Sequence, residues 1–236
     1  MLPNNIIIIP ARKNSKTIKN KNIKKFSKKP LIYWTIKLAI ASKLGLVCVS
    51  TDCKKIRNYA LSIGASAPFL RPKKFATDTA TTESVILHAI SHYKKNGVFL
   101  KNFILLQPTS PLRSLQDLDD AWKLFKNSKN CTSVFSVREA IANNNPNWMV
   151  KINKFKKVEG FVCKFIPNFL TRRQDLPKVY IRNDYVYISE VKNIFLKKPN
   201  LYGKNPKVLI TDKNRIDIDI NNSTDWKAAE YFFNCK

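Results

Sequence analysis

The sequence has no long hydrophobic run. Its most apolar stretch, Ile6 to Ile9, is four residues long and follows no cluster of basic residues. A secretory signal needs an apolar core of about 7 to 15 residues, and a membrane-spanning helix needs about 20. We therefore expect neither a signal peptide nor a spanning helix, and we expect a protein without a membrane partner.

Cysteine and histidine are too few and too scattered to suggest a disulfide framework or a zinc site. The five cysteines form no C-x-x-C pair, and there are only two histidines. This usage is typical of reduced thiols, so we expect a cytoplasmic protein. The glycine-rich Walker spacing GxxxxGK[ST] is also absent, which excludes that mode of nucleotide binding.

Acidic residues are scarce as well, since 16 of them stand against 43 basic residues and give a formal net charge of +27. Such a charge suits nucleic acid, an anionic membrane or small polyanionic substrates. Most lysines are spread along the chain, as on a solvated surface. The densest stretch, Ala11 to Lys29, follows the first apolar run, where α/β proteins bind phosphate. No nucleic-acid reading motif accompanies the charge, so a basic nucleic-acid-binding protein is the weaker alternative.

Short apolar runs alternate with helical periodicities through the first 137 residues. The runs predict strands at Asn5–Pro10, Leu46–Ser50, Phe103–Leu106 and Thr132–Val137, and the periodicities predict helices near residues 31–41, 56–63, 84–95 and 115–125. This alternation predicts an α/β protein. We expect three αβα layers around a mainly parallel, Rossmann-like sheet, with ligands bound beyond the carboxyl ends of its strands.

The pattern breaks in residues 138–177, which are polar and interrupted by Pro146 and Pro167. We expect one domain, residues 1–236, from which residues 138–177 protrude as a lobe over the site or as an arm to a second subunit. Regular elements resume with predicted strands at Tyr185–Ser189, Val208–Thr211 and Arg215–Ile220, and a helix at residues 224–234.

Three segments carry residues suited to chemistry. Asp217 and Asp219 alternate on the predicted strand Arg215–Ile220, so both carboxylates would share one face about 7 Å apart and could hold a hard divalent cation. The basic loop from Pro10 to Lys16 offers backbone N–H groups and cations to a polyphosphate. Gln107 to Pro111 forms a stiff polar turn after a strand. The ordinary alternatives are an exposed strand face, a solvated loop and a rigid turn.

Taken in order, these and other blocks resemble the acylneuraminate cytidylyltransferases, the CMP-sialic acid or CMP-nonulosonic acid synthetases. That family has a signature close to PARxGSKxxxxKN, followed by GKPLI and a WTI-type helix. This chain has PARKNSKTIKNKN from Pro10, then KKPLI and WTI. Further matching blocks along nearly the whole chain are STD at 50, LRP at 70, ATDT at 76, LLQPTSPLR at 105, RRQDLP at 172 and IDID at 216.

The resemblance implies transfer of CMP from CTP to the anomeric hydroxyl of a sialic-acid-like nonulosonic acid, with release of pyrophosphate, by a Mg²⁺-dependent homodimer. The acceptor could be N-acetylneuraminic, legionaminic or pseudaminic acid. Carried over by the resemblance, the nucleotide would be bound by Arg12, Lys16, Lys21, Asn22, Arg71, Ala80 and Thr82. The acid sugar would be bound by Gln107, Arg173, Gln174, Asn183, Asp184 and Tyr185. The metal would be bound by Asp217 and Asp219, which with Arg12 and Lys21 form the implied catalytic set.

Three departures from the family pattern stand out: Lys13-Asn14 replaces two small residues, Asn183-Asp184-Tyr185 replaces Asn-Gly-Ala, and Ile220 replaces a threonine. The second predicts a modified nonulosonic acid as acceptor, unless Asp184 faces solvent and Tyr185 faces the core. A Kdo-type cytidylyltransferase is the nearest alternative, although the RRQDLP block favours the sialic branch. A metal-dependent glycosyltransferase is less favoured, because its acidic motif usually follows a central strand.

Overall fold

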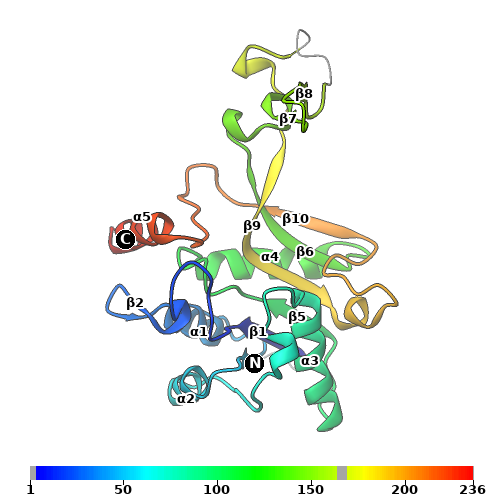
Figure 1. Cartoon of the computed structure of the whole chain (residues 1–236). Helices are drawn as coiled ribbons and strands as arrows, with labels where there is room; N and C mark the ends of the chain where they lie inside the picture. The colour runs from blue at the N-terminus through cyan, green and yellow to red at the C-terminus, as the bar shows by residue number, and fades with distance from the viewer. Residues whose placement is uncertain (1–3, 164–168, 236) are drawn as a thin grey trace.

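The computed structural model describes residues 4–163 and 169–235, so Phe165 and Pro167 of the expected protrusion lie outside the described residues. One six-stranded sheet runs through the molecule in the order β10-β6-β9-β5-β1-β4 (Figure 1). The strands are β1 Asn5–Pro10, β4 Leu46–Ser50, β5 Asn102–Leu105, β6 Ser133–Glu139, β9 Tyr180–Glu190 and β10 Pro206–Ile210. Within this six-stranded sheet β9 alone runs antiparallel to its neighbours, so the predicted mainly parallel sheet is confirmed.

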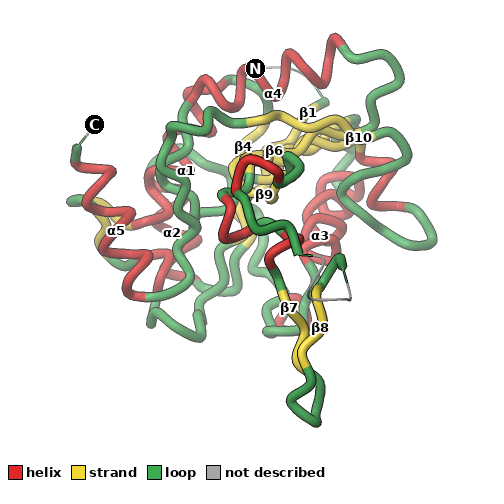
Figure 2. The backbone as a smooth tube through the Cα atoms, turned by 90° about the horizontal axis from the view of Figure 1, so that it is seen from above, coloured by secondary structure: helices red, strands yellow, loops and turns green. Residues whose placement is uncertain are grey.

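Helices cover both faces of the sheet, as Figure 2 shows. They are α1 Leu31–Ser42, α2 Lys54–Ser62, α3 Thr82–Lys95, α4 Leu115–Asn127 and α5 Ser223–Asn234. The isoleucine run of β1 explains the layering, because alternate side chains point to opposite faces. Ile7 and Ile9 pack with α1, α2 and α4, while Ile6 and Ile8 pack with α3. The expected αβα arrangement is confirmed. Among the described residues, no helix has the length and apolar character needed to cross a bilayer.

A third, smaller core lies where α5 packs against the start of α1 and the short antiparallel pair β2 Lys25–Phe26 and β3 Lys29–Pro30. Phe26 is fully buried there and meets Trp226 edge to face, with ring centroids 5.4 Å apart. Ile220, one of the departures from the family pattern, is fully buried in the same core. The C-terminal helix is thereby fixed beside the basic loop that follows β1.

The segment between β6 and β9 projects beyond the sheet (Figure 1). Its described part contains short 3-10 turns and the antiparallel hairpin of β7 Val150–Ile152 and β8 Val158–Gly160. Because β6 runs parallel to β1 and β5, its carboxyl end leads into this projection from the same edge of the sheet. Phe155 and Phe161 of the projection are 79% and 52% exposed.

The prediction of a strand at Arg215–Ile220 is wrong. These residues form an irregular connection between β10 and α5, and β10 is itself the edge of the sheet. The alternation of Asp and Ile misled the prediction, because an extended loop anchored by its apolar residues has the same pattern. The Ile220 N–H donates to the carbonyl of Thr109 (2.9 Å), and the Ile216 carbonyl accepts from the Tyr185 hydroxyl (3.1 Å).

Candidate active site

A cavity of about 260 Å³ opens at the carboxyl ends of β1 and β5. Five residues predicted from separate sequence blocks line it: Arg12, Arg71, Ala80, Thr82 and Gln107. They come from the loop after β1, the loop before α3, the start of α3 and the turn after β5. The structure therefore brings these distant blocks together at the edge of the sheet where α/β folds bind ligands.

Asp78 holds the basic loop at the mouth of this cavity. Its carboxylate lies 2.6 Å from Arg12 Nη1 and 3.4 Å from Lys16 Nζ. Arg12 Nη1 also donates to the carbonyl of Thr77 (3.2 Å). Desolvation raises the pKa of Asp78, but the hydrogen bond from Arg12 and the charge of Lys16 outweigh it, so the pKa lies below its usual value. Two predicted phosphate-binding cations thus share one exposed carboxylate, which an incoming phosphate can replace.

Arg71 is the buried cation of the cavity. Its side chain and backbone are only 5% exposed, and its backbone N–H donates to the carbonyl of Thr51 (2.7 Å). Its Nε and Nη2 have no hydrogen-bond partner among the described residues. Burial lowers the pKa of this guanidinium, with Asp52 opposing the shift. Buried donors without partners are costly, so their presence beside a cavity indicates that a ligand supplies the acceptors.

Lys21 and Asn22 are not among the residues that line the cavity. The Asn22 side-chain amide donates to the carbonyl of Arg12 (3.0 Å), which fixes the start of the basic loop. The Lys21 ammonium donates to the carbonyl of Ile220 (2.8 Å). Burial lowers the pKa of Lys21, while the charge of Asp219 raises it. Lys21 therefore joins the basic loop to the segment that carries the two predicted metal ligands.

Asp217 and Asp219 are close enough to interact, although no strand aligns them. Arg138 Nε lies 3.3 Å from Asp217 Oδ2. Burial raises the pKa of Asp217 to about 6, with Arg138 opposing and Asp219 adding to the shift. Asp219 Oδ2 accepts from the Asn221 amide (2.9 Å), whereas the buried Oδ1 has no partner in the part of the chain that the structure describes.

This donor set fits Mg²⁺ held mainly by substrate. Among the described residues, no group of three or more Asp, Glu, His or Cys side chains could enclose a metal ion. Mg²⁺ at phosphate sites is commonly bound by one or two carboxylates together with phosphate oxygens and water. The Asp219 oxygen that has no partner among the described residues could supply one such ligand, and Asp217 is the neighbouring carboxylate.

Gln107 follows the end of β5, and Asn183 and Asp184 lie in the neighbouring strand β9. Asp184 has a left-handed backbone with φ of 54°, next to an irregularity in the β6–β9 pairing. Its carboxylate accepts from the Tyr187 hydroxyl. The Asn183 amide donates to Thr211 Oγ1 (2.9 Å) and is only 5% exposed. The bulge thus sets the local backbone of Asn183 and Asp184 within β9.

Tyr185 belongs to the core. It is fully buried, and the Arg215 guanidinium lies 5.5 Å from its ring centroid. This is the alternative placement considered from the sequence, so Tyr185 does not itself border the cavity. Arg173 and Gln174 lie apart from the other predicted sugar-binding residues. They are exposed in the 3-10 turn Arg173–Asp175 of the projection, and Arg173 borders a separate hollow of about 110 Å³.

Arg113 was missed as a site residue, although it ends the LLQPTSPLR block. It is 6% exposed, and its Nη2 donates to the carbonyls of Gln107 (2.8 Å) and Asp184 (3.4 Å). Burial lowers its pKa to about 10, with Asp117 the main opposing charge. Its Nε and Nη1 have no partner among the described residues. Arg113 therefore clamps two predicted sugar-binding residues and keeps two free donors.

Buried cations with free donors, at the carboxyl edge of a mainly parallel α/β sheet, suit the transfer of a nucleotide phosphate. The class of protein defined by this fold and site is a nucleotidyltransferase. Residues 6–207 match the cytidylyltransferase family, and the chain belongs to that family. It is an enzyme that uses CTP, which confirms the resemblance found in the sequence.

The similarity to known proteins extends over nearly the whole chain. The chain is 30% identical to the CMP-N,N'-diacetyllegionaminic acid synthase of Legionella pneumophila, with 95% of this chain and 94% of that protein covered. It is 31% identical to the N-acylneuraminate cytidylyltransferase of Escherichia coli, with 95% of this chain matching 51% of that longer protein. The solved structure of a CMP:2-keto-3-deoxy-manno-octonic acid synthetase with CTP has a TM-score of 0.71 at 14% identity, covers 98% of both chains, and supports the fold alone.

Proposed function

We propose that the chain transfers CMP from CTP to the anomeric hydroxyl of a sialic-acid-like nonulosonic acid and releases pyrophosphate. One observation carries the proposal: Arg12, Arg71 and Gln107, from three distant blocks, line one cavity at the carboxyl edge of the sheet. The names of the two similar proteins support the acceptor class. Membership of the cytidylyltransferase family favours this reaction over the glycosyltransferase and nucleic-acid-binding alternatives.

The proposed chemistry is in-line attack of the anomeric oxygen on the α-phosphorus of CTP, with pyrophosphate as the leaving group. The work of the protein is to align the two reactants and to stabilise negative charge on the phosphates. Arg12 and Lys16 would exchange Asp78 for triphosphate oxygens, because both already point at one carboxylate. Arg71 would place its free donors on the nucleotide. Gln107 would then face the acceptor from the end of β5.

In this proposal Asp219 and Asp217 would hold Mg²⁺ together with the substrate, and the ion would supply charge neutralisation at the reacting phosphate. Lys21 connects this pair to the basic loop through its hydrogen bond to Ile220. A movement of the segment that carries Asp217 and Asp219 would therefore also move the basic loop.

The proposal includes a homodimer built with the projecting segment. Ile152, Phe155 and Phe161 are 67%, 79% and 52% exposed in the single chain. Exposed apolar groups gathered on one projection are typical of an interface. A monodisperse monomer in light scattering at micromolar concentration would contradict the dimer. The scarcity of paired cysteines supports the further proposal of a cytoplasmic location.

The direct test is to incubate the protein with CTP, Mg²⁺ and one acceptor at a time from a panel of nonulosonic acids. We expect equimolar pyrophosphate and a CMP-sugar of the predicted mass. UTP and ATP serve as nucleotide controls, and Kdo serves as the control for a shorter acid sugar. Pyrophosphate release with Kdo alone would establish the Kdo-type alternative, and no CMP-sugar with any acceptor would refute the proposed reaction.

A further inference from the structure

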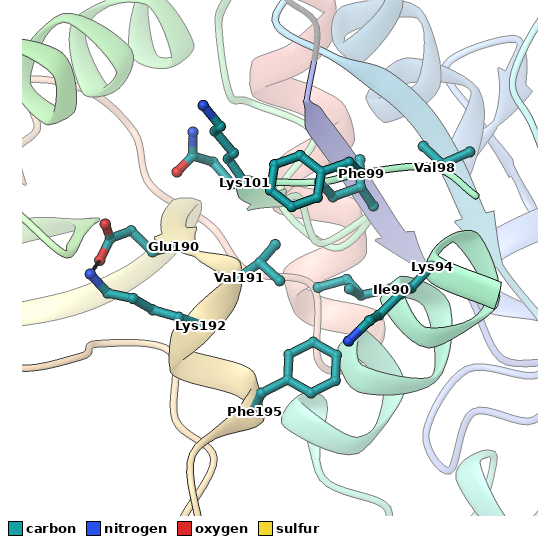
Figure 3. Close-up of a pocket in the computed structure, with 11 residues that line it drawn as sticks. Ile90, Lys94, Val98, Phe99, Lys101, Glu190, Val191, Lys192 and Phe195 are labelled. Carbon is teal, nitrogen blue, oxygen red and sulfur yellow. Dashed lines mark ion pairs between the residues drawn. The ribbon is translucent and has the colours of Figure 1, made fainter. Parts of the chain in front are cut away.

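A second cavity, of about 560 Å³, lies at the other edge of the sheet from the nucleotide cavity (Figure 3). It is bordered by the first residue of β5, Asn102, and the last residue of β9, Glu190, which are partners in the sheet. Gln107 and the nucleotide cavity lie beyond the opposite end of β5. Along α3, Thr82 borders the nucleotide cavity and Lys94 borders the second one, roughly 18 Å further along the helix axis.

The walls of the second cavity are mainly apolar and partly open to water. Ile90, Val98, Phe99, Leu100, Val191 and Phe195 contribute to its lining. Phe99 and Phe195 line the cavity but are 69% and 47% exposed. A ligand bound in the cavity could cover both rings. Its volume falls within the range of about 300 to 1,000 Å³ that is usual for small-molecule sites, which are mostly apolar with a few polar groups.

Three lysines line the cavity, Lys94, Lys101 and Lys192, and in the part of the chain that the structure describes Lys94 is the one that lies over an aromatic ring of the cavity wall. Its ammonium lies 5.4 Å from the ring centroid of Phe195, and Figure 3 shows the two side chains converging at the cavity. Lys192 already has a carboxylate partner, since its ammonium lies 2.8 Å from Glu190 Oε2. Among residues 4–163 and 169–235, no carboxylate pairs with Lys94 or with Lys101.

We propose that this cavity is a binding site for a small anionic amphiphile, with its apolar body between Ile90, Phe99 and Phe195 and its anionic group on Lys94. The charge decides between classes of occupant. A neutral apolar molecule would leave the ammonium without a partner, whereas a carboxylate, sulfonate or phosphate would pair with it and let the apolar part cover the exposed rings. The proposal is independent of the proposed reaction, because the two cavities lie at opposite edges of the sheet.

The probe for the test is anilinonaphthalene sulfonate, an apolar ring system with one anionic group, and its uncharged counterpart is N-phenyl-naphthylamine. Fluorescence titration of the full chain should show saturable binding of the sulfonate. Phe195→Ala should weaken the binding of both probes by about tenfold, because apolar contact is lost. Lys94→Gln should weaken the binding of the sulfonate by about two- to fivefold and leave the binding of the uncharged probe unchanged.

Another cavity of the same volume, about 560 Å³, provides matched controls: it is lined by Ile40, Lys43 and Leu61 among others. Lys43→Gln and Leu61→Ala should leave both affinities unchanged, and saturating CTP should not displace the sulfonate. Displacement by CTP, or equal weakening by the control variants, would overturn the proposal. So would concentration-dependent self-association that Phe195→Ala abolishes, since the occupant would then be a second copy of the chain.

Discussion

Arg12 and Asp78 form a 2.6 Å ion pair at the mouth of the cavity that collects the predicted nucleotide-binding residues. Asp78 therefore pairs with a cation proposed to bind the triphosphate, and Lys16 lies 3.4 Å from the same carboxylate. An anionic ligand must displace Asp78 before it can bind both cations. We therefore propose that the pair holds the basic loop when no nucleotide is bound, and that Asp78 competes with CTP for Arg12.

This competition makes opposite predictions for the two partners. Arg12→Ala should weaken CTP binding by about 1.5 to 3 kcal/mol, through loss of a charge-assisted contact. Asp78→Asn should tighten CTP binding by about two- to fivefold, because a competing carboxylate is removed. Calorimetry measures both affinities. Asp119→Asn changes the net charge equally on the remote helix α4 and should have no effect. Weaker CTP binding by Asp78→Asn would show that Asp78 positions Arg12 instead of competing for it.

Asp219→Ala should abolish Mg²⁺-dependent turnover and leave the fold intact. The expected loss in kcat is more than about 100-fold, because the variant removes the unpartnered buried oxygen proposed to bind the metal. Turnover is measured across a Mg²⁺ titration, with circular dichroism as the check on folding. Asp212→Ala, a variant of an exposed aspartate in the same loop, should retain its Mg²⁺ dependence. Full activity of Asp219→Ala would refute the metal assignment.

Arg113→Met should separate stability from activity. The variant loses the hydrogen bonds to the carbonyls of Gln107 and Asp184, which destabilises the fold. It also removes a buried charge whose Nε and Nη1 have no partner among the described residues, which stabilises the fold. Because the two effects oppose each other, the free energy of unfolding should change by less than about 1 kcal/mol. We expect kcat/KM to fall more than tenfold, because Gln107 and Asp184 lose their common anchor. Urea unfolding and steady-state kinetics measure the two effects. A loss of about 3 kcal/mol in stability with unchanged kcat/KM would make Arg113 a structural residue only.

Much of the fold could be predicted, because its core follows local patterns. The isoleucine run of β1 and the apolar spacing of α1 each specify an element without information from elsewhere. The direction of β9 could not be predicted in the same way. β9 reverses because the chain crosses the long projection before it returns, and it starts at Tyr180, five residues before the predicted Tyr185.

The site could be predicted in part for the same reason. Arg12, Arg71 and Gln107 stand in recognisable blocks, and the fold gathers them. The roles of Asp78 and Arg113 depend on contacts between segments far apart in the sequence, so their blocks did not reveal those roles. The strand expected at Arg215–Ile220 failed because alternation alone cannot show whether a neighbouring strand exists to pair with it.

The cysteines should differ widely in reactivity. Burial raises the pKa of the Cys48 thiol to about 12, so almost no thiolate forms at pH 8, whereas Cys235 is exposed. A disulfide reagent at pH 8 should modify Cys235 rapidly and Cys48 only when the sheet opens. Mass spectrometry of time points identifies the sites, and Cys235→Ser is the control that removes the fast site. Rapid labelling of Cys48 in the folded protein would contradict its buried position in the sheet.

Specificity is best tested at Asp184, because the structure separates it from Tyr185. Tyr185→Ala would empty a fully buried site and should cost about 3 to 5 kcal/mol of stability, so a change in its acceptor preference could not be assigned to the sugar site. Asp184→Gly avoids this problem, since glycine accepts the φ of 54° without strain, which offsets the lost hydrogen bond from Tyr187.

If the carboxylate of Asp184 repels or selects part of the acceptor, Asp184→Gly should raise kcat/KM for N-acetylneuraminic acid relative to legionaminic and pseudaminic acids. The measurement is kcat/KM across the acceptor panel for the natural protein and for this variant. Tyr187→Phe is the matched control, because it frees the Asp184 carboxylate from its hydroxyl partner but keeps the charge. We expect this control to preserve or strengthen the preference for the modified acids. An unchanged ranking in Asp184→Gly, with N-acetylneuraminic acid already the best acceptor, would refute the role of Asp184 and leave the cytidylyltransferase reaction untouched.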